Sequence, residues 1–172
     1  MSETNDNLRE GFLQTDLEWV ERNDPLYIDP VTETFNRQAY EVFIPRLLEE
    51  ARKNKTPLTI SVLDLDGFKK YNDVNGHDAG DQLLKKIGES WEKLIRKTDY
   101  LLRYGGDEWV MAFRNTTKKQ FEENILPKVR QIVEENGLGI SIGTSQLKND
   151  DDPRTLFIRA DAEMYKDKNS RK

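Results

Sequence analysis

The sequence lacks cysteine altogether, and it also lacks any long apolar run. Without cysteine the chain can form no disulfide and no thiolate site, which is compatible with a reducing compartment. No apolar run approaches the roughly 20 residues that a membrane-spanning helix needs, and the N-terminus has no signal-peptide core. We therefore expect a cytoplasmic protein, and we expect that this chain does not insert into a membrane.

The chain also lacks an excess of positive charge, because its 27 basic and 32 acidic residues give a formal net charge of −5. A long nucleic acid favours a basic surface, so we expect no nucleic-acid partner. A single nucleotide remains compatible, since metal ions can neutralise its phosphates. The length of 172 residues, with 35% hydrophobic and 34% charged residues, predicts one globular domain with a proper core.

The first residues differ in character from the rest. Residues 1–24 are polar and acidic, with apolar side chains at nearly helical spacing. This pattern is compatible with a frayed terminus or with a short connecting helix. We therefore expect a tail or linker helix over residues 1–24 and the functional domain over residues 25–172.

The candidate chemistry centres on the stretch from Arg103 to Val110, which reads RYGGDEWV. Apolar runs on both sides of Gly105 and Gly106 predict a β-hairpin, because glycine accepts the positive φ angles of a tight turn. Asp107 and Glu108 follow at once, on opposite faces of the strand. An ordinary hairpin tip would look much the same.

A second acidic cluster makes the hairpin more informative. Asp64 and Asp66 end an apolar, β-branched run at residues 58–63 that is typical of a buried strand. A carboxylate there is costly to bury alone, so Asp64 favours a metal or a cation, whereas Asp66 is better interpreted as solvent-exposed. Together with the hairpin, this cluster predicts divalent metal at a phosphate.

The residues after Asp66 suit a nucleotide. Gly67-Phe68-Lys69 opens a helix, and helix N-termini bind phosphate readily; Lys69 is equally compatible with a solvated surface position. Asn72 and Asp81 can match the donors and acceptors of guanine, although alone each would be interpreted as a cap or turn residue. His77, in a Gly-His-Asp loop, is more often structural than catalytic.

These motifs resemble a known family. GGDEW at residues 105–109 is similar to the GGDEF signature of diguanylate cyclases, with Trp109 in the final position. The resemblance continues in DLDGFKKYND, GHDAGDQLL and RADAEMY, and it covers roughly residues 29–169 in the family's order and spacing. The chain departs from the pattern at Glu33 and Thr34, where glycine and leucine would stand, and the family's final strand is missing.

The resemblance implies an α/β fold, with a five-stranded mixed sheet wrapped by helices and an active-site hairpin, as in nucleotidyl cyclases and polymerase palms. Alternating strands and helices around a hairpin favour a mixed sheet independently. The implied reaction, a nucleotidyl transfer, condenses two GTP into cyclic di-GMP and two pyrophosphates. One domain binds one GTP, so at least a transient homodimer is expected.

The resemblance also implies roles for individual residues. Asp107 would be the catalytic base with Glu108 in support, and the Asp64 carboxylate, the Leu65 main-chain oxygen and Asp107 would hold Mg²⁺ or Mn²⁺, two ions per active site. The implied substrate-binding residues are Phe68, Lys69, Asn72, His77, Asp81, Gly105, Gly106, Lys168, Arg171 and Lys172. Arg171 stands one place before the family's arginine, whose register Lys172 takes, so either residue is a candidate phosphate ligand.

Arg96 and Asp99 lie before the hairpin and have two interpretations. A cation and an Asp at a helix end are typical of a cap, but Arg-x-x-Asp five residues before Gly105 resembles the family's product-inhibition motif. Three alternatives to the cyclase remain open at this point. They are a domain that binds GTP or cyclic di-GMP without turnover, a template-using polymerase palm, and a structural domain with an acidic hairpin.

Overall fold

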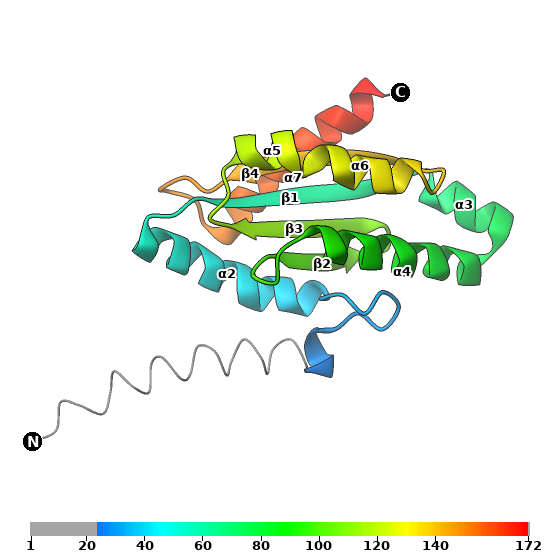
Figure 1. The fold of residues 1–172 in the computed structure, drawn as a ribbon, viewed down its shortest axis with the longest axis horizontal. Coiled ribbons are helices and arrows are strands. Elements are labelled where there is room, and N and C mark those ends of the chain that lie inside the picture. The colour runs from blue at the N-terminus through cyan, green and yellow to red at the C-terminus, as the bar shows by residue number, and fades with distance from the viewer. Residues whose placement is uncertain (1–23, 172) are drawn as a thin grey trace, which may run out of the picture.

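The structure, a computed structural model, describes residues 24–171 (Figure 1). In chain order its elements are η1 (Pro25–Tyr27), α2 (Arg37–Asn54), β1 (Leu58–Asp66), α3 (Phe68–Asn75), α4 (His77–Leu94), β2 (Tyr100–Gly105), β3 (Glu108–Arg114), α5 (Lys118–Asn124), α6 (Leu126–Glu134), β4 (Gly139–Gln146) and α7 (Pro153–Ser170). The tail or linker helix expected over residues 1–24 falls outside the described residues, apart from Asp24.

The sheet corrects the prediction in two respects. Four strands form it, in the order β2-β3-β1-β4, and every neighbouring pair is antiparallel. The five-stranded, mixed sheet is therefore wrong for the described residues. β1 and β2 run in the same direction but do not pair, because the hairpin places β3 between them. The expected fifth strand came from the resemblance alone, and the residues after β4 form α7 instead.

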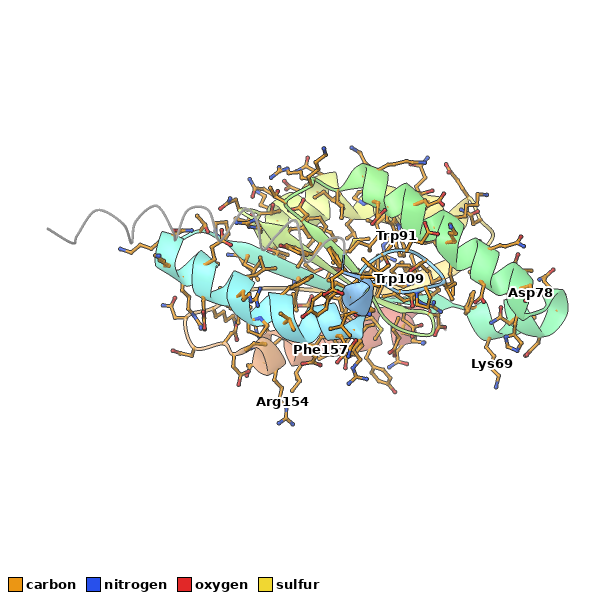
Figure 2. All side chains as sticks on the ribbon, turned by 90° about the horizontal axis from the view of Figure 1, so that it is seen from below. Lys69, Asp78, Trp91, Trp109, Arg154 and Phe157 are labelled. Carbon is orange, nitrogen blue, oxygen red and sulfur yellow. The ribbon has the colours of Figure 1, made fainter. Side chains whose placement is uncertain are left out.

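Helices cover both faces of the sheet, and each face has its own apolar cluster. Figure 2 shows α2 and α7 on one side and α4, α5 and α6 on the other. Alternate residues of β1 divide between the clusters, because successive strand residues point to opposite faces: Ile60 and Val62 pack toward α2 and α7, and Leu63 and Leu65 toward α4 and α6. Asp64 therefore lies on the face that α7 covers.

The helices follow local signals in the sequence. Asp152 caps α7 by accepting a hydrogen bond from the Thr155 N–H at 2.6 Å, and Pro127 lies in the first turn of α6, just after the break that separates α5 from α6. Pro45 does not interrupt α2, which continues from Arg37 to Asn54. Within residues 24–171, no helix combines the length and the apolarity that crossing a bilayer requires.

The turn at residues 29–36 explains how the chain accommodates its two departures from the family pattern. Glu33 takes the left-handed φ of 61° that favours glycine, and its carboxylate pairs with Lys85 of α4 at 2.5 Å. Thr34 is buried, and its hydroxyl lies 2.9 Å from that of Thr32. The turn therefore closes with an ion pair and a hydroxyl pair.

Candidate active site

The acidic residues of the two motifs meet at one end of the sheet. Asp64 of β1 stands opposite Glu108 of β3 in the strand register, so these two side chains share the face covered by α7. Asp107 lies in the turn, and its carbonyl oxygen accepts a hydrogen bond from the Leu65 N–H at 3.2 Å. Residues that lie about 40 positions apart in the sequence thus form one cluster.

The hairpin turn lies one residue later than predicted. Gly105 still belongs to β2 and pairs with Glu108, after an irregularity between Arg103 and Gly105. Gly106 and Asp107 are the turn residues, and only Gly106 of the two glycines has a positive φ, of 47°. Both glycines face open space, since a Cβ built on either would have no neighbour within 4 Å.

Burial and neighbouring carboxylates raise the pKa values of Asp107 and Glu108. Burial raises the pKa of Asp107, and the nearby charge of Asp64 raises it further. Burial also raises the pKa of Glu108, with added repulsion from Asp64, Asp107 and Asp161 of α7. The site therefore holds more negative charge than its own cations balance.

Lys168 of α7 is the cation that enters this cluster. Its Nζ donates to Asp64 Oδ1 at 2.7 Å, and Asp64 is only 8% exposed. The hydrogen bond to Asp64 raises the pKa of Lys168, which keeps the ammonium charged. Asp161 lies two helical turns before Lys168, on the same face of α7. That spacing is a sequence signal that would have predicted Asp161 near the cluster.

The donor set fits a hard divalent cation that also binds substrate. Within residues 24–171, no three Asp, Glu, His or Cys side chains are grouped as a metal site. Mg²⁺, however, is usually held by one or two carboxylates plus substrate phosphates, and Asp64 and Asp107 supply that number. Because N–H and C=O of an antiparallel strand residue point to one side, the Leu65 carbonyl also faces the turn.

A pocket of about 420 Å³ lies beside the cluster and is lined by Asp66, Gly67, Gly139, Lys168 and Arg171. Gly67 has a φ of 82° and begins α3, so main-chain N–H groups at this helix start are near the pocket. Asp66 is not simply solvent-exposed, because both its oxygens accept from the Ser141 hydroxyl, at 2.8 and 2.9 Å. The lining combines two cations with a helix N-terminus, which suits an anion.

The residues predicted to bind the substrate phosphates differ in their exposure and in whether they line this pocket. The side chain of Phe68 is buried, so only its main chain can contact a ligand there. Lys69 is exposed and points away from the corner between α3 and α4 (Figure 2). Arg171 lines the pocket, whereas Lys172 lies outside the described residues.

The candidate guanine residues lie at the corner between α3 and α4. Asn72 packs against Gly80 so closely that a Cβ built on Gly80 would be 1.8 Å from Asn72 Oδ1. That oxygen is buried and, within residues 24–171, has no hydrogen-bond partner. Asp81 and His77 are exposed on the first turns of α4. The corner thus holds a buried amide oxygen without a partner among the described residues, and an exposed carboxylate at Asp81.

Arg103 is a residue whose role the sequence did not indicate. Its Nε donates to the Gly106 carbonyl at 2.9 Å, and its Nη1 donates to Asp29 Oδ1 at 2.9 Å. Burial alone would raise the pKa of Asp29, but hydrogen bonds from Thr32 and Arg103 together hold it below its usual range. Arg103 therefore ties the hairpin turn to the turn at residues 29–36.

Arg96 and Asp99 lie away from this cluster, between α4 and β2. Asp99 Oδ2 accepts from the Arg96 N–H at 3.1 Å, and Oδ1 accepts from the Arg114 N–H at 3.2 Å. Asp99 is 3% exposed, whereas the Arg96 side chain is exposed beside a pocket of about 220 Å³. The structure therefore supports a turn-closing role for Asp99 and leaves Arg96 available to a ligand.

Comparisons with known proteins agree with the arrangement. The profile of a family described as "Diguanylate cyclase, GGDEF domain" matches residues 26–172. Diguanylate cyclase DosC of Escherichia coli is 29% identical over 147 residues, which is 80% of this chain and 32% of that protein. Diguanylate cyclase DgcS of Shewanella oneidensis is 28% identical over 158 residues, covering 90% of this chain and 53% of that protein. The chain thus spans about a third to a half of these relatives.

Solved structures of similar fold point the same way. A microbial GGDEF domain studied with cyclic di-GMP has a TM-score of 0.78 and 32% identity, over 84% of this chain and 92% of that one. The coiled coil and GGDEF domain of DgcB from Caulobacter crescentus, in complex with cyclic di-GMP, has a TM-score of 0.78 and 26% identity, over 95% and 91%. On this match of profile and fold, the chain belongs to the diguanylate cyclase GGDEF-domain family.

Proposed function

We propose that this chain is a diguanylate cyclase, which condenses two GTP into cyclic di-GMP and two pyrophosphates. One observation carries the proposal: Asp64, Asp107 and Glu108 gather at one end of the sheet, and Lys168 joins them to an adjacent pocket lined by cations. Acidic residues beside an anion-binding pocket suit a metal-dependent reaction at phosphate. The names of DosC and DgcS support the same chemistry.

The acidic cluster would perform the bond-forming step. The 3′-hydroxyl of each GTP attacks the α-phosphate of the other, a phosphodiester forms, and pyrophosphate leaves. Asp107, with its raised pKa, accepts the hydroxyl proton more readily than an ordinary aspartate, and Glu108 supports it. Asp64, Asp107 and the Leu65 carbonyl would hold two Mg²⁺ or Mn²⁺ ions. These ions would supply charge stabilisation at the phosphate oxygens.

The pocket and the helical corner would bind the rest of GTP. Lys168, Arg171 and the N–H groups that begin α3 would take the terminal phosphates. Asp81 would accept from the N1 and N2 donors of guanine, and Asn72 would assist. ATP lacks these donors, and sites built around hydrogen bonds reject such analogues by roughly 10⁴-fold or more. If a mixture of GTP and ATP gave a mixed guanine–adenine dinucleotide in a yield comparable to that of cyclic di-GMP, this assignment of Asp81 would be contradicted.

Gly80 offers a sharper test of the base site. Because Asn72 Oδ1 occupies the space that a Cβ on Gly80 would need, Gly80→Ala must displace the Asn72 amide. We expect this substitution to weaken GTP binding while tripolyphosphate binding stays unchanged. Lys86→Ala, at an exposed position further along α4, serves as the control and should bind GTP like wild type.

Two domains must meet for the reaction, because each domain binds one GTP and the reaction joins two GTP molecules. The homodimer is therefore required at least transiently. Cyclic di-GMP would also bind at the exposed Arg96, in the turn that Asp99 closes, away from the carboxylate cluster, and would restrain this encounter. GTP is a cytoplasmic nucleotide, so the reaction belongs in the cytoplasm.

The decisive experiment is to incubate the protein with GTP and Mg²⁺ and to identify the products by chromatography. Cyclic di-GMP and pyrophosphate, formed only with the metal present, are the expected result. A second candidate function is binding of GTP or cyclic di-GMP without turnover, which the departures of the turn at Glu33 and Thr34 from the family pattern keep open. Calorimetric binding of either nucleotide with no product would support that candidate and exclude the cyclase.

A further inference from the structure

Asp167 of α7 makes more contacts than any role in the proposed reaction requires. Its Oδ2 accepts from Arg130 Nη2 at 2.8 Å and from the Ile142 N–H at 2.9 Å. Its Oδ1 accepts from Arg171 Nε at 3.2 Å. Arg130 in turn donates to the Ile140 carbonyl at 2.8 Å. One carboxylate thus joins the end of α7 to β4, to α6 and to a residue that lines the pocket.

We propose that Asp167 is a positioning residue that holds the Arg171 guanidinium at the pocket, so that Arg171 binds the terminal phosphates of the substrate. This inference rests on the proposed function for the identity of the substrate. It concerns Arg171, one of the two candidate phosphate ligands, because Arg171 lines the pocket and pairs with Asp167, whereas Lys172 lies outside the described residues.

The charges of the cluster suit this role. Asp167 would by itself repel a phosphate, but Arg130 lies 2.8 Å from it and balances its charge. Arg171 therefore keeps a net positive charge for an anion. A guanidinium has five N–H donors, and within residues 24–171 Arg171 pairs only with Asp167, through Nε. The remaining donors can form the paired hydrogen bonds that guanidinium groups make with phosphate.

The position of Arg171 explains why it needs a restraint. It is the C-cap residue of α7, and its side chain is 39% exposed. An unrestrained arginine loses rotamer freedom when it binds a ligand, at a cost of about 0.5–1.5 kcal/mol. Asp167 imposes that order beforehand, because it is itself fixed to β4 and α6.

A double-mutant cycle tests the proposal, with 3′-deoxyguanosine triphosphate and Mg²⁺ as the probe. This analogue lacks the attacking hydroxyl, so calorimetry measures binding without turnover. We expect Asp167→Ala to weaken binding roughly two- to ten-fold, as loss of the preordering predicts. In the Arg171→Ala background the same substitution should have no further effect. GMP, which has no terminal phosphates, should bind equally to all four proteins.

Controls separate a positioning role from a structural one. Lys119→Ala and Glu123→Ala remove an exposed pair of the same i,i+4 spacing on α5, away from the pocket, and should leave binding unchanged. Asp167→Asn keeps an acceptor for the Ile142 N–H if Asp167→Ala melts early, and it should weaken binding less. The proposal would be overturned if Asp167→Ala lowered affinity for the GTP analogue equally with Arg171 present and with Arg171→Ala. It would also be overturned if a folded Asp167→Ala protein bound the analogue as tightly as wild type.

Tripolyphosphate with Mg²⁺ distinguishes this proposal from the proposed function. If wild type fails to bind the guanosine analogue but binds tripolyphosphate with the same Asp167–Arg171 coupling, the positioning role stands and the cyclase assignment fails. If wild type binds the analogue and the coupling is absent, the cyclase assignment stands and the positioning role fails. If neither probe binds wild type, the pocket takes no phosphate and the inference is wrong.

Discussion

Asp107 and Asp99 are both carboxylates at turns, and burial raises the pKa of each. Their neighbours differ. The two oxygens of Asp99 accept main-chain N–H groups of Arg96 and Arg114, which oppose the effect of burial on its pKa. Asp107 instead lies beside Asp64 and Glu108, and the charge of Asp64 raises its pKa further. The fold thus supplies hydrogen-bond donors to Asp99, whereas it places other negatively charged carboxylates beside Asp107.

This difference indicates which carboxylate the fold needs and which one a ligand needs. A buried acceptor that closes a turn contributes to stability, and its loss leaves main-chain donors unpaired. A group of like charges costs stability and persists where a cation or a reacting group will balance it. Asp99 is therefore expected to act on folding, and Asp107 on chemistry.

The largest expected effect is on turnover. Asp107→Asn keeps the shape of the side chain but removes its charge, so the variant loses a metal ligand and a base. We expect cyclic di-GMP formation to fall about 10²-fold or more, as general acid–base catalysis typically contributes. The rate is measured by chromatography, with circular dichroism to show that the variant is folded. Wild-type turnover by folded Asp107→Asn would remove Asp107 from the mechanism.

The matching change at the other turn should act on stability instead. Asp99→Ala leaves the N–H groups of Arg96 and Arg114 without their acceptor, at a cost of about 2 kcal/mol. Urea denaturation followed by circular dichroism measures this loss. Glu123→Ala, at an exposed position of α5, is the control and should unfold like wild type. A stable Asp99→Ala protein that loses product affinity would mean that Asp99 serves the ligand after all.

Arg96 separates the two roles within that turn, because Asp99 accepts from its main chain and not from its side chain. Arg96→Ala therefore leaves the turn intact. We expect cyclic di-GMP affinity to fall about ten-fold, since a hydrogen bond to a charged group contributes about 1.5–3 kcal/mol. The initial rate should stay near that of wild type while the late yield rises. Equal affinities by calorimetry, with no GTP present, would make this motif a helix cap only.

The sequence predicted the elements well where one local signal decides them. The apolar run before Asp64 is β1, and Gly67 begins α3. The strand count and direction were wrong, because pairing depends on which strand the hairpin places next to β1. No local pattern in the residues of β1 encodes that neighbour.

The candidate site shows the same division. Asp64 and Asp107 were predicted from the two acidic motifs, Lys168 was implied by the family resemblance, and the structure brings the three together. The contacts of Arg103 with Asp29 and of Asp167 with Arg130 were not predicted. Each joins residues on different elements, 74 and 37 positions apart, so no periodicity connects them. The roles of the predicted residues in binding and catalysis stay predictions.

The smallest expected effect is on the stability of the metal-free protein. Because the pKa of Asp107 in the folded state lies above its ordinary value of 3.8, ionisation penalises the fold once the pH exceeds that raised value. Below pH 3.8 the carboxyl is neutral in both states and the penalty is absent. Asp107→Asn should therefore raise the melting temperature at pH 7. The corresponding gain in the free energy of unfolding is less than about 1 kcal/mol, because solvent screens the site.

The same comparison carries its own check. The advantage of Asp107→Asn should vanish in acid, and added Mg²⁺ should stabilise wild type more than the variant, since a cation that binds the folded carboxylates favours the fold. Calorimetric melting at pH 7 and at pH 3, with and without Mg²⁺, measures all three differences. If the variant melts below wild type at pH 7 without metal, Asp107 belongs with Asp99 among the carboxylates that the fold needs. The contrast between the two turns would then not hold.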